Sequence, residues 1–286
     1  MRRDASRFMK GIDTRKRILE IGPFYSPIFT KAEADVYYAD ICNDSEILQK
    51  FKNEPCVKKA VSIDYVIKES YTADLKNVPP FDYVISCHVL EHIPRIIDFF
   101  LDIQNVMSPG GLFYAMLPDH RYCFDHFRQP TSFAEAWHVH VSKIPCAPWS
   151  VLEHVMDTIS CNDSTVFWKD DSLAVTNLLS SVKEWERLVE TYEKTVDGAV
   201  TDVHFSVFTP KTFLYFTYNM IRAGVFPWQY KSFCFTPYRD FTFSFSLAAC
   251  PAMVSDLEIA RHEMTKIAAL MDEDEKLLNG KTIQWF

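Results

Sequence analysis

The sequence predicts an α/β fold in which a Rossmann-like, doubly wound and mostly parallel sheet of seven strands carries a helical insertion. Three observations lead to this fold class. Short apolar strands alternate with helical patterns along residues 1–118, the alternation stops between residues 119 and 205, and strand patterns return from residue 206 on. Because a strand followed by a helix must cross over to reach its neighbour, the alternating part is expected to form a parallel sheet.

We expect one domain overall, made of three consecutive parts. Residues 1–118 form the first half of the sheet, and residues 119–205 form a mainly helical insertion with four of the six tryptophans. Residues 206–286 complete the sheet and end in a helix. The chain has 286 residues, of which 48% are hydrophobic, so it is large enough for a single extended core.

In the first part, apolar runs rich in β-branched residues predict five buried strands. These strands cover residues 17–22, 35–41, 61–67, 81–87 and 112–117. Helical patterns cover residues 45–52 and 95–107, and the second has an apolar face that includes Ile96, Phe100 and Ile103. A Ser-Pro-Gly-Gly turn at residues 108–111 leads into the fifth strand.

The later elements are marked by their end signals. Thr209 is a typical N-cap, Pro210 suits the first helical turn, and Gly224 suits the end of the same helix. Strands are predicted at residues 228–236 and 241–249, and a final helix at residues 255–271. Within the insertion, the apolar spacing between residues 182 and 192 is helical.

Composition excludes several classes of protein. The formal net charge is −8, which argues against a nucleic-acid partner because phosphate binding needs clustered basic residues. There is neither a signal peptide pattern nor a membrane span, so we expect a cytoplasmic protein. The eight cysteines contain no Cys-x-x-Cys pair, which favours reduced thiols and gives no zinc knuckle. The oligomeric state stays open.

The candidate ligand site lies at the carboxyl ends of the predicted strands, where open parallel sheets bind their ligands. Gly22 ends the first strand and lets the backbone approach a ligand closely. A nicotinamide fingerprint would need further glycines where Phe24 and Pro27 stand, so this pattern fails. Asp40 lies at the end of the second strand, where a carboxylate can accept two hydrogen bonds from a ribose diol.

Two stretches carry a resemblance to a known family. The strand and loop of residues 81–93, with the string His88-Val89-Leu90-Glu91-His92, and the turn Ser108-Pro109-Gly110-Gly111 resemble class I S-adenosylmethionine-dependent methyltransferases of small molecules. With residues 18–22 and Asp40, the resemblance covers residues 17–118. The family loop usually has two or three glycines, whereas this chain has Phe24 and Tyr25 after its single Gly22.

A narrower similarity concerns residues 117–125, 202–205 and 208–210. These stretches are similar to a bacterial subgroup of methyltransferase-domain proteins that is associated with glycan and surface-polysaccharide gene neighbourhoods. The association is an analogy between sequences and contains no chemistry of its own.

The resemblance implies a cofactor, S-adenosylmethionine, and the residues around it. Glu20, Gly22 and Pro23 would face its methionine part, although a structural role for the Glu20 carboxylate is an equal alternative. Asp40 would hold the ribose hydroxyls and Ile41 would lie beside the adenine. The remaining expected neighbours border the adenine or close over the sulfonium: Ser70, Tyr71, Ser86, Cys87 and His88.

Methyl transfer requires an acceptor held in line with the methyl group, and a hydroxyl acceptor also gains from a general base. His120, directly after the fifth strand, is the first candidate for this base, and His204 is the second. Glu91, His92 and Asp119 do not form a recognised metal pattern, so no metal is predicted. The candidate acceptor-binding residues are Arg121, Tyr122, Asp125 and His154.

The leading hypothesis is an O-methyltransferase for a small polar acceptor, such as a sugar, a nucleotide-linked sugar or a phosphorylated precursor of a surface glycan. The insertion would then select the acceptor. A methyltransferase for an aromatic or lipidic small molecule is an alternative, because the insertion is rich in aromatic residues. A methyltransferase-like binding or scaffold protein without activity is a third, motivated by the glycine-poor loop.

Overall fold

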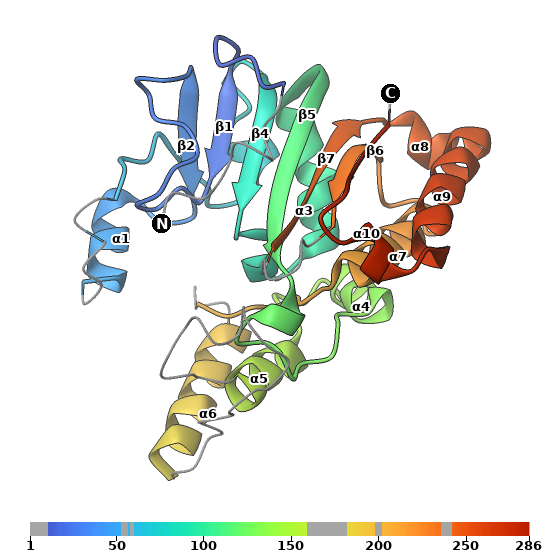
Figure 1. Ribbon diagram of the computed structural model, residues 1–286. Helices are drawn as coiled ribbons and strands as arrows, with labels where there is room; N and C mark the ends of the chain where they lie inside the picture. Colours follow the sequence, from blue (N-terminus) through green and yellow to red (C-terminus); the bar gives the residue numbers. More distant parts are fainter. Residues whose placement is uncertain are drawn as a thin grey trace.

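The computed structural model describes residues 11–52, 57, 60–158, 182–197, 202–235 and 242–285. Within these residues, one eight-stranded sheet has the order β3-β2-β1-β4-β5-β7-β6-β8 (Figure 1). The strands are β1 (Ile18–Ile21), β2 (Val36–Asp40), β3 (Tyr65–Val66), β4 (Phe81–Cys87), β5 (Met107–Pro118), β6 (Trp228–Cys234), β7 (Thr242–Ala249) and β8 (Thr282–Gln284).

The prediction of a seven-stranded, mostly parallel sheet is wrong in two respects. Only the five strands from β3 to β5 are mutually parallel, whereas β7 is antiparallel to both β5 and β6, and β8 is antiparallel to β6. The connection between β6 and β7 is short, and short connections suit antiparallel neighbours. The eighth strand follows the last helices and has only three residues.

The helices broadly follow the predictions, with shifts at their ends. The predicted helix at residues 95–107 stops at Ile103, and Met107 already belongs to β5, which also contains the predicted turn. The predicted last helix, residues 255–271, corresponds to α9, which begins at Leu257 after the short helix α8 ends at Ser255. The helices are α1 (Asp44–Lys50), α2 (Tyr71–Asp74), α3 (Ile96–Ile103), α4 (Phe133–Ser142), α5 (Pro148–Asp157), α6 (Val182–Val196), α7 (Pro210–Arg222), α8 (Ala252–Ser255), α9 (Leu257–Asp272) and α10 (Glu275–Leu278), with short 3-10 turns at η2 (Leu90–His92), η3 (Gln104–Val106) and η4 (His120–Tyr122).

The two faces of the sheet are covered differently. On one face, Val84 and Phe113 belong to the large core that includes Phe100 of α3, Phe213 of α7 and Ile267 of α9. On the other face, a smaller core is completed by residues of loops. In this second core the strand residues Ile18, Ile85 and Tyr114 pack with Ile28, Phe29 and Ile63. Helices therefore fix one face, while the loop after β1 helps to seal the other.

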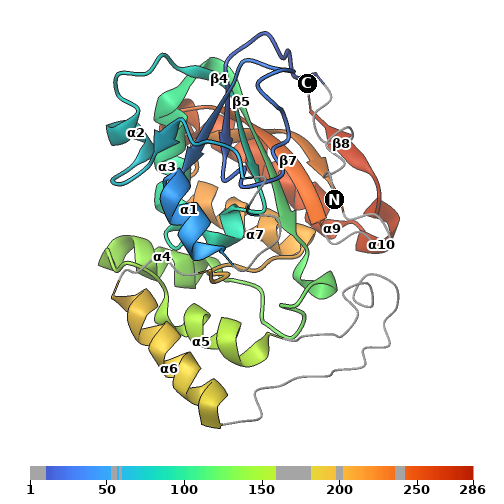
Figure 2. The same ribbon diagram turned by 90° about the vertical axis from the view of Figure 1, so that its left-hand side faces the viewer.

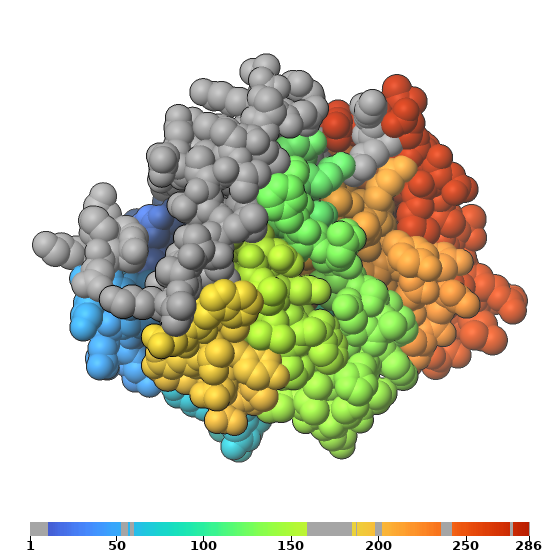
Figure 3. Space-filling view, turned by 90° about the horizontal axis from the view of Figure 1, so that it is seen from below, coloured from blue at the N-terminus to red at the C-terminus, as the bar shows by residue number. Residues whose placement is uncertain are grey.

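The insertion lies beyond the carboxyl ends of the parallel strands. Helices α4, α5 and α6 form a layer at this end of the sheet (Figure 2), and they occupy much of the surface seen from below (Figure 3). The insertion leaves and rejoins the sheet at one point, because Asp119 forms an isolated parallel bridge with Phe208 and the backbone N–H of His120 donates to the Phe208 carbonyl at 3.0 Å. Residues 159–181 and 198–201 of the predicted insertion lie outside the described residues.

Membrane-spanning helices are not among the described elements, since each helix there is too short or too polar to cross a bilayer.

Candidate functional site

The strand order reverses between β1 and β4, and this reversal defines the switch point of the sheet. The register pairs Ile21 of β1 with Ala39 of β2 and with Ser86 of β4. The next residues along these strands, Gly22, Asp40 and Cys87, therefore lie side by side at the carboxyl edge. The sequence predicts this juxtaposition, and the structure confirms it.

The turn at Gly22 requires glycine for two reasons. Its φ is +61°, and a Cβ at this position would lie 2.7 Å from Cγ2 of Val89. Glu20 anchors the loop that follows. Its carboxylate is buried and accepts hydrogen bonds from the backbone N–H groups of Ile28 (2.7 Å) and Phe29 (3.3 Å). Glu20 thus has the structural role that the sequence left open.

Aromatic packing supports the glycine-poor part of this loop. Phe24 has a φ of +45°, a conformation that costs a non-glycine residue energy. Its ring lies against that of Phe51, just after α1, at 4.6 Å between centroids, and edge-on to Tyr25 at 5.0 Å. These contacts compensate for the missing glycines, while the neighbouring Pro23 is buried.

Asp40 is partly buried at the end of β2. Its carboxylate accepts a hydrogen bond from the N–H of Cys42 at 2.9 Å, and burial raises the pKa of the Asp40 carboxyl above its ordinary value. The adjacent Ile41 is 48% exposed and offers an apolar surface. Ser70 caps α2 by accepting from the N–H of Ala73, and the Tyr71 ring is buried in the core, so both side chains have contacts within the fold, and their place beside the adenine stays a prediction.

The end of β4 contributes three adjacent residues. Ser86 is fully buried, and its Oγ has no hydrogen-bond partner among the described residues. Cys87 is also buried, with its Sγ 3.7 Å from Sδ of Met116. His88 has a φ of +55°, and its Nδ1 lies 3.5 Å from Oε1 of Glu91. Positive φ values at non-glycine residues concentrate at functional sites.

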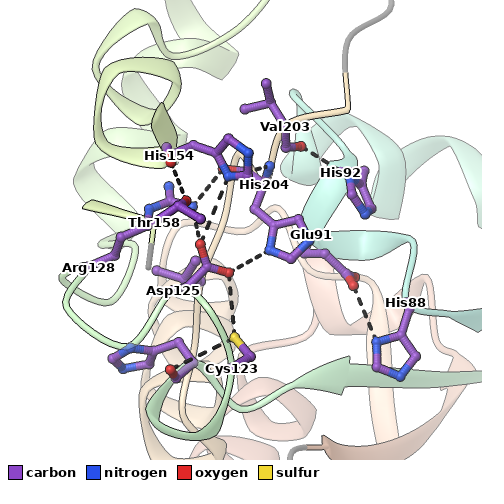
Figure 4. A network of polar contacts seen from close by, with 12 residues as sticks. His88, Glu91, His92, Cys123, Asp125, Arg128, His154, Thr158, Val203 and His204 are labelled. Carbon is purple, nitrogen blue, oxygen red and sulfur yellow. Dashed lines mark hydrogen bonds and ion pairs between the residues drawn. The ribbon is translucent and has the colours of Figure 1, made fainter. Parts of the chain in front are cut away.

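A set of imidazole and carboxylate groups lies close by, between the end of β4 and the insertion (Figure 4). We call it the imidazole cluster, and its members are Glu91, His92, Asp125, His154 and His204. These residues come from η2 after β4, the loop after β5, helix α5 and the segment of residues 202–207.

Hydrogen bonds order this cluster. Nδ1 of His204 lies 2.5 Å from Oδ2 of Asp125, and because a carboxylate only accepts, this nitrogen is the donor. Nδ1 of His92 likewise donates to the carbonyl oxygen of Val203 at 3.1 Å. Nδ1 of His154 accepts from the backbone N–H of His204 at 3.3 Å. The rings of His92 and His204 meet edge to face, with 4.5 Å between their centroids.

Burial and charge move the pKa values in opposite directions. Burial lowers the pKa of His154 to about 4 and also lowers that of His92. Burial alone would lower the pKa of His204 too, but the hydrogen bond to Asp125 and the charge of that carboxylate raise it above the ordinary value. Burial opposes ionisation of Asp125, yet His204 and Arg128 together keep its pKa well below the ordinary value.

Arg128 is the buried cation behind the cluster. Its Nη1 donates to Oδ1 of Asp125 and to the carbonyl oxygen of His204, both at 2.9 Å, and its Nη2 donates to the carbonyl oxygen of Ser150 at 3.3 Å. The side chain is only 1% exposed. Arg128 therefore fixes the position of the Asp125 carboxylate.

The predicted acceptor-binding residues separate into two groups. Asp125 and His154 belong to the imidazole cluster. Arg121 is bound by Asp119, with its Nε 2.9 Å and its Nη2 2.5 Å from the carboxylate oxygens, and its guanidinium lies over the ring of Tyr122. His120 is buried, and its Nδ1 has no partner among the described residues. The Asp125–His204 pair was missed because no local pattern joins residues so far apart.

A further triad within the cluster was also missed. Glu91, His92 and His204 each offer one ligand atom, and these three atoms lie within 4.8 Å of one another. The prediction grouped Glu91 and His92 with Asp119 instead, which the structure pairs with Arg121. The available signal in the sequence was the adjacent Glu-His pair shortly after β4.

The turn after β1, the carboxylate at the end of β2 and the polar groups at the end of β4 meet at the switch point of an α/β sheet, where such sheets commonly bind nucleotide-like ligands. The comparison with protein families makes this specific. A family model described as "Methyltransferase domain" matches residues 1–161, more than half of the chain, and the chain belongs to this family. It is an S-adenosylmethionine-dependent methyltransferase, and S-adenosylmethionine is its cofactor, as the sequence predicts.

Solved structures give more distant similarities. One from Rhodobacter sphaeroides, described provisionally as a Zn-dependent alcohol dehydrogenase, has 13% identity and a TM-score of 0.45, covering 86% of this chain and 89% of that chain. One from Listeria monocytogenes, described provisionally as an S-adenosylmethionine dependent methyltransferase, has 12% identity and a TM-score of 0.39, covering 86% and 97%. The plantazolicin methyltransferase BpumL in complex with SAH has 12% identity and a TM-score of 0.37, covering 83% and 77%. No curated protein matches the chain.

Proposed function

We propose that the chain is an O-methyltransferase that acts on a hydroxyl group of a small polar acceptor. The observation that supports this proposal is the imidazole cluster, which lies next to the end of β4, where the sulfonium is expected. The acceptor oxygen attacks the methyl carbon, the C–O bond forms, and the S–CH₃ bond breaks with its electrons left on S-adenosylhomocysteine. The hydroxyl proton must leave, and this is the step that imidazole and carboxylate groups assist.

The cofactor site follows from the switch point. Asp40 binds the ribose diol, Ile41 lies against the adenine, and Gly22 with Pro23 faces the methionine part. Ser86, Cys87 and His88 surround the sulfonium. Support for Ser86 comes from its buried Oγ, which lacks a partner among the described residues, because a bound cofactor would supply one.

His204 is the residue that we assign to the acceptor hydroxyl, in preference to His120. Asp125 fixes the orientation of the His204 ring, and His92 of η2 packs edge to face with that ring. Phe124 is 37% exposed and its ring lies 4.7 Å from that of His204, which provides an apolar surface beside the polar group. A sugar-like acceptor with hydroxyl groups and an apolar ring face suits this combination, and the glycan-associated subgroup that residues 117–125 resemble points the same way.

The test is product analysis with a matched pair of variants. The wild-type chain is incubated with methyl-¹³C-labelled S-adenosylmethionine and a panel of sugars, nucleotide-linked sugars and sugar phosphates, and products are identified by the carbon shift of the methyl group. A methoxy signal is expected. His204→Asn should lower kcat by roughly 10²–10⁴-fold with unchanged cofactor affinity, whereas His262→Asn, an exposed position on α9, should not. An N-methyl or C-methyl product, or full turnover of His204→Asn, would overturn the proposal.

A further inference from the structure

We propose that Glu91, His92 and His204 form a binding site for one divalent transition-metal ion. The three ligand atoms already lie within 4.8 Å of one another. In a tetrahedral zinc site, bonds of about 2.0–2.2 Å place neighbouring ligand atoms about 3.4 Å apart. Small side-chain rotations therefore suffice to close the site around an ion.

Both imidazoles are oriented as metal ligands usually are. Metal-binding histidines commonly donate one ring N–H to a carboxylate or a backbone carbonyl, which leaves the other nitrogen as the ligand atom. Here Nδ1 of His204 donates to Asp125 and Nδ1 of His92 donates to the Val203 carbonyl. The ligand atom of each ring is then Nε2. Arg128 in turn holds Asp125, so the orientation of His204 is supported by a second layer of contacts.

Glu91 supplies the negative charge that such an ion requires. The residue is 2% exposed, and its Oε2 is buried with no hydrogen-bond partner among the described residues. Its other oxygen, Oε1, lies 3.5 Å from Nδ1 of His88. A buried carboxylate oxygen without a partner is costly, and a cation between Glu91 and the two imidazoles would remove that cost.

The backbone preorganises the site. Glu91 and His92 are adjacent in η2, whereas His204 comes from the segment that returns from the insertion. The two segments are joined directly, because the N–H groups of Phe205 and Ser206 both donate to the carbonyl oxygen of Glu91, at 2.7 and 3.2 Å. These backbone hydrogen bonds therefore hold the three ligand residues close to one another.

The donor set indicates the class of ion. Two imidazoles and one carboxylate suit Zn²⁺ and other first-row transition metals, whereas Mg²⁺ and Ca²⁺ prefer oxygen ligands. Three protein ligands leave a coordination position open, as in catalytic zinc sites. If the proposed O-methylation is right, the acceptor hydroxyl can occupy this position. With the ion bound, Nε2 of His204 would be occupied and could not accept the proton, so His204 would act on the acceptor through the ion. The ion would lower the pKa of the hydroxyl, and the proton would be lost to water before methyl transfer.

Metal binding can be measured without cofactor, acceptor or activity, so its outcome is independent of the proposed function. The chain is stripped with a chelator and titrated with Zn²⁺ in competition with a chromogenic chelator. We expect one equivalent per chain, and Co²⁺ in place of Zn²⁺ should give the visible absorption of a four- or five-coordinate site. If the chain binds S-adenosylmethionine but does not bind Zn²⁺, the metal proposal is refuted while the proposed methyltransferase function is not.

Variants locate the ion. Glu91→Gln and His92→Ala should abolish tight binding, and Asp125→Asn should weaken it by roughly 10–100-fold through the orientation of His204. His262→Ala, an exposed histidine on α9, is the matched control and should bind as the wild type does. Circular dichroism confirms that each variant is folded. Two outcomes would overturn the proposal: a Zn²⁺ affinity that is unchanged in Glu91→Gln, or a wild-type chain that gives no Co²⁺ absorption bands. In either case, the arrangement would instead be explained by a protonated His204 between the carboxylates of Asp125 and Glu91.

Discussion

The glycine at the end of β1 offers a quantitative test of the switch-point geometry. In Gly22→Ala, the left-handed φ of +61° costs about 1–2 kcal/mol for a residue with a Cβ. The added carbon would also lie 2.7 Å from Cγ2 of Val89, and overpacking of this kind costs roughly 1–3 kcal/mol. We therefore expect a loss of about 2–5 kcal/mol in the free energy of unfolding.

The chain provides a control for the backbone contribution. Gly110 in β5 also has a positive φ, +76°, but a Cβ there would meet nothing within 4 Å. Gly110→Ala should therefore lose only the conformational part, about 1–2 kcal/mol. The contact itself is tested by adding Val89→Ala to Gly22→Ala, because removal of Cγ2 makes room for the new carbon and should restore part of the loss.

Urea unfolding followed by circular dichroism gives the free energies of unfolding for the wild type and four variants. These are Gly22→Ala, Gly110→Ala, Val89→Ala and the double variant of Gly22→Ala with Val89→Ala. The reasoning is refuted if Gly22→Ala is no less stable than Gly110→Ala. It is also refuted if Val89→Ala destabilises the Gly22→Ala background as much as it destabilises the wild type, since the two positions would then not be coupled.

Three other predictions concern single side chains. Asp40→Ala should weaken S-adenosylmethionine binding by roughly 1.5–3 kcal/mol in calorimetric titration. Because burial raises the Asp40 pKa, the wild-type affinity should begin to fall on acidification at a pH above the ordinary aspartate value of 3.8, and equal affinity in the variant would contradict this ribose site. Arg128→Met should cost about 3–5 kcal/mol of stability in urea unfolding, because Asp125 would lose one of its two buried partners, whereas Arg15→Met, in an exposed pair with Asp13, should change little. Ser86→Ala should leave the unfolding midpoint unchanged or higher while lowering cofactor affinity, and unchanged affinity would place Ser86 outside the cofactor site.

The positions of the strands and helices were largely predictable, because burial imposes a local pattern. β4 occupies residues 81–87 as predicted, and Thr209, Pro210 and Gly224 mark the ends of α7 as expected. The direction of β6, β7 and β8 was not predictable from the same patterns. An apolar run such as residues 242–249 shows that a strand is buried, but it does not identify which neighbour the strand pairs with or in which sense.

The candidate site was predictable only in part, for a related reason. Gly22, Asp40 and Cys87 lie at the carboxyl ends of their strands, so the rule for parallel sheets brings them together. The imidazole cluster depends instead on where the insertion returns, as in the contact between His92 and Val203, which are 111 positions apart. No periodicity encodes such a contact. Histidines and acidic residues could be named as candidates, but their pairing required the fold.

The shared point at which the insertion leaves and rejoins the sheet has a consequence for how this chain can diversify. Asp119 directly follows β5 and Phe208 shortly precedes α7, and a parallel bridge joins the two residues, so the two ends of the insertion lie side by side. Closing a longer loop between fixed ends costs only about 0.6 kcal/mol for each doubling of its length. The segment between these two residues is thus a natural unit for exchange between related chains. Under the proposed function, a graft that keeps the aspartate–histidine pair next to η2 should change the acceptor without rebuilding the cofactor half.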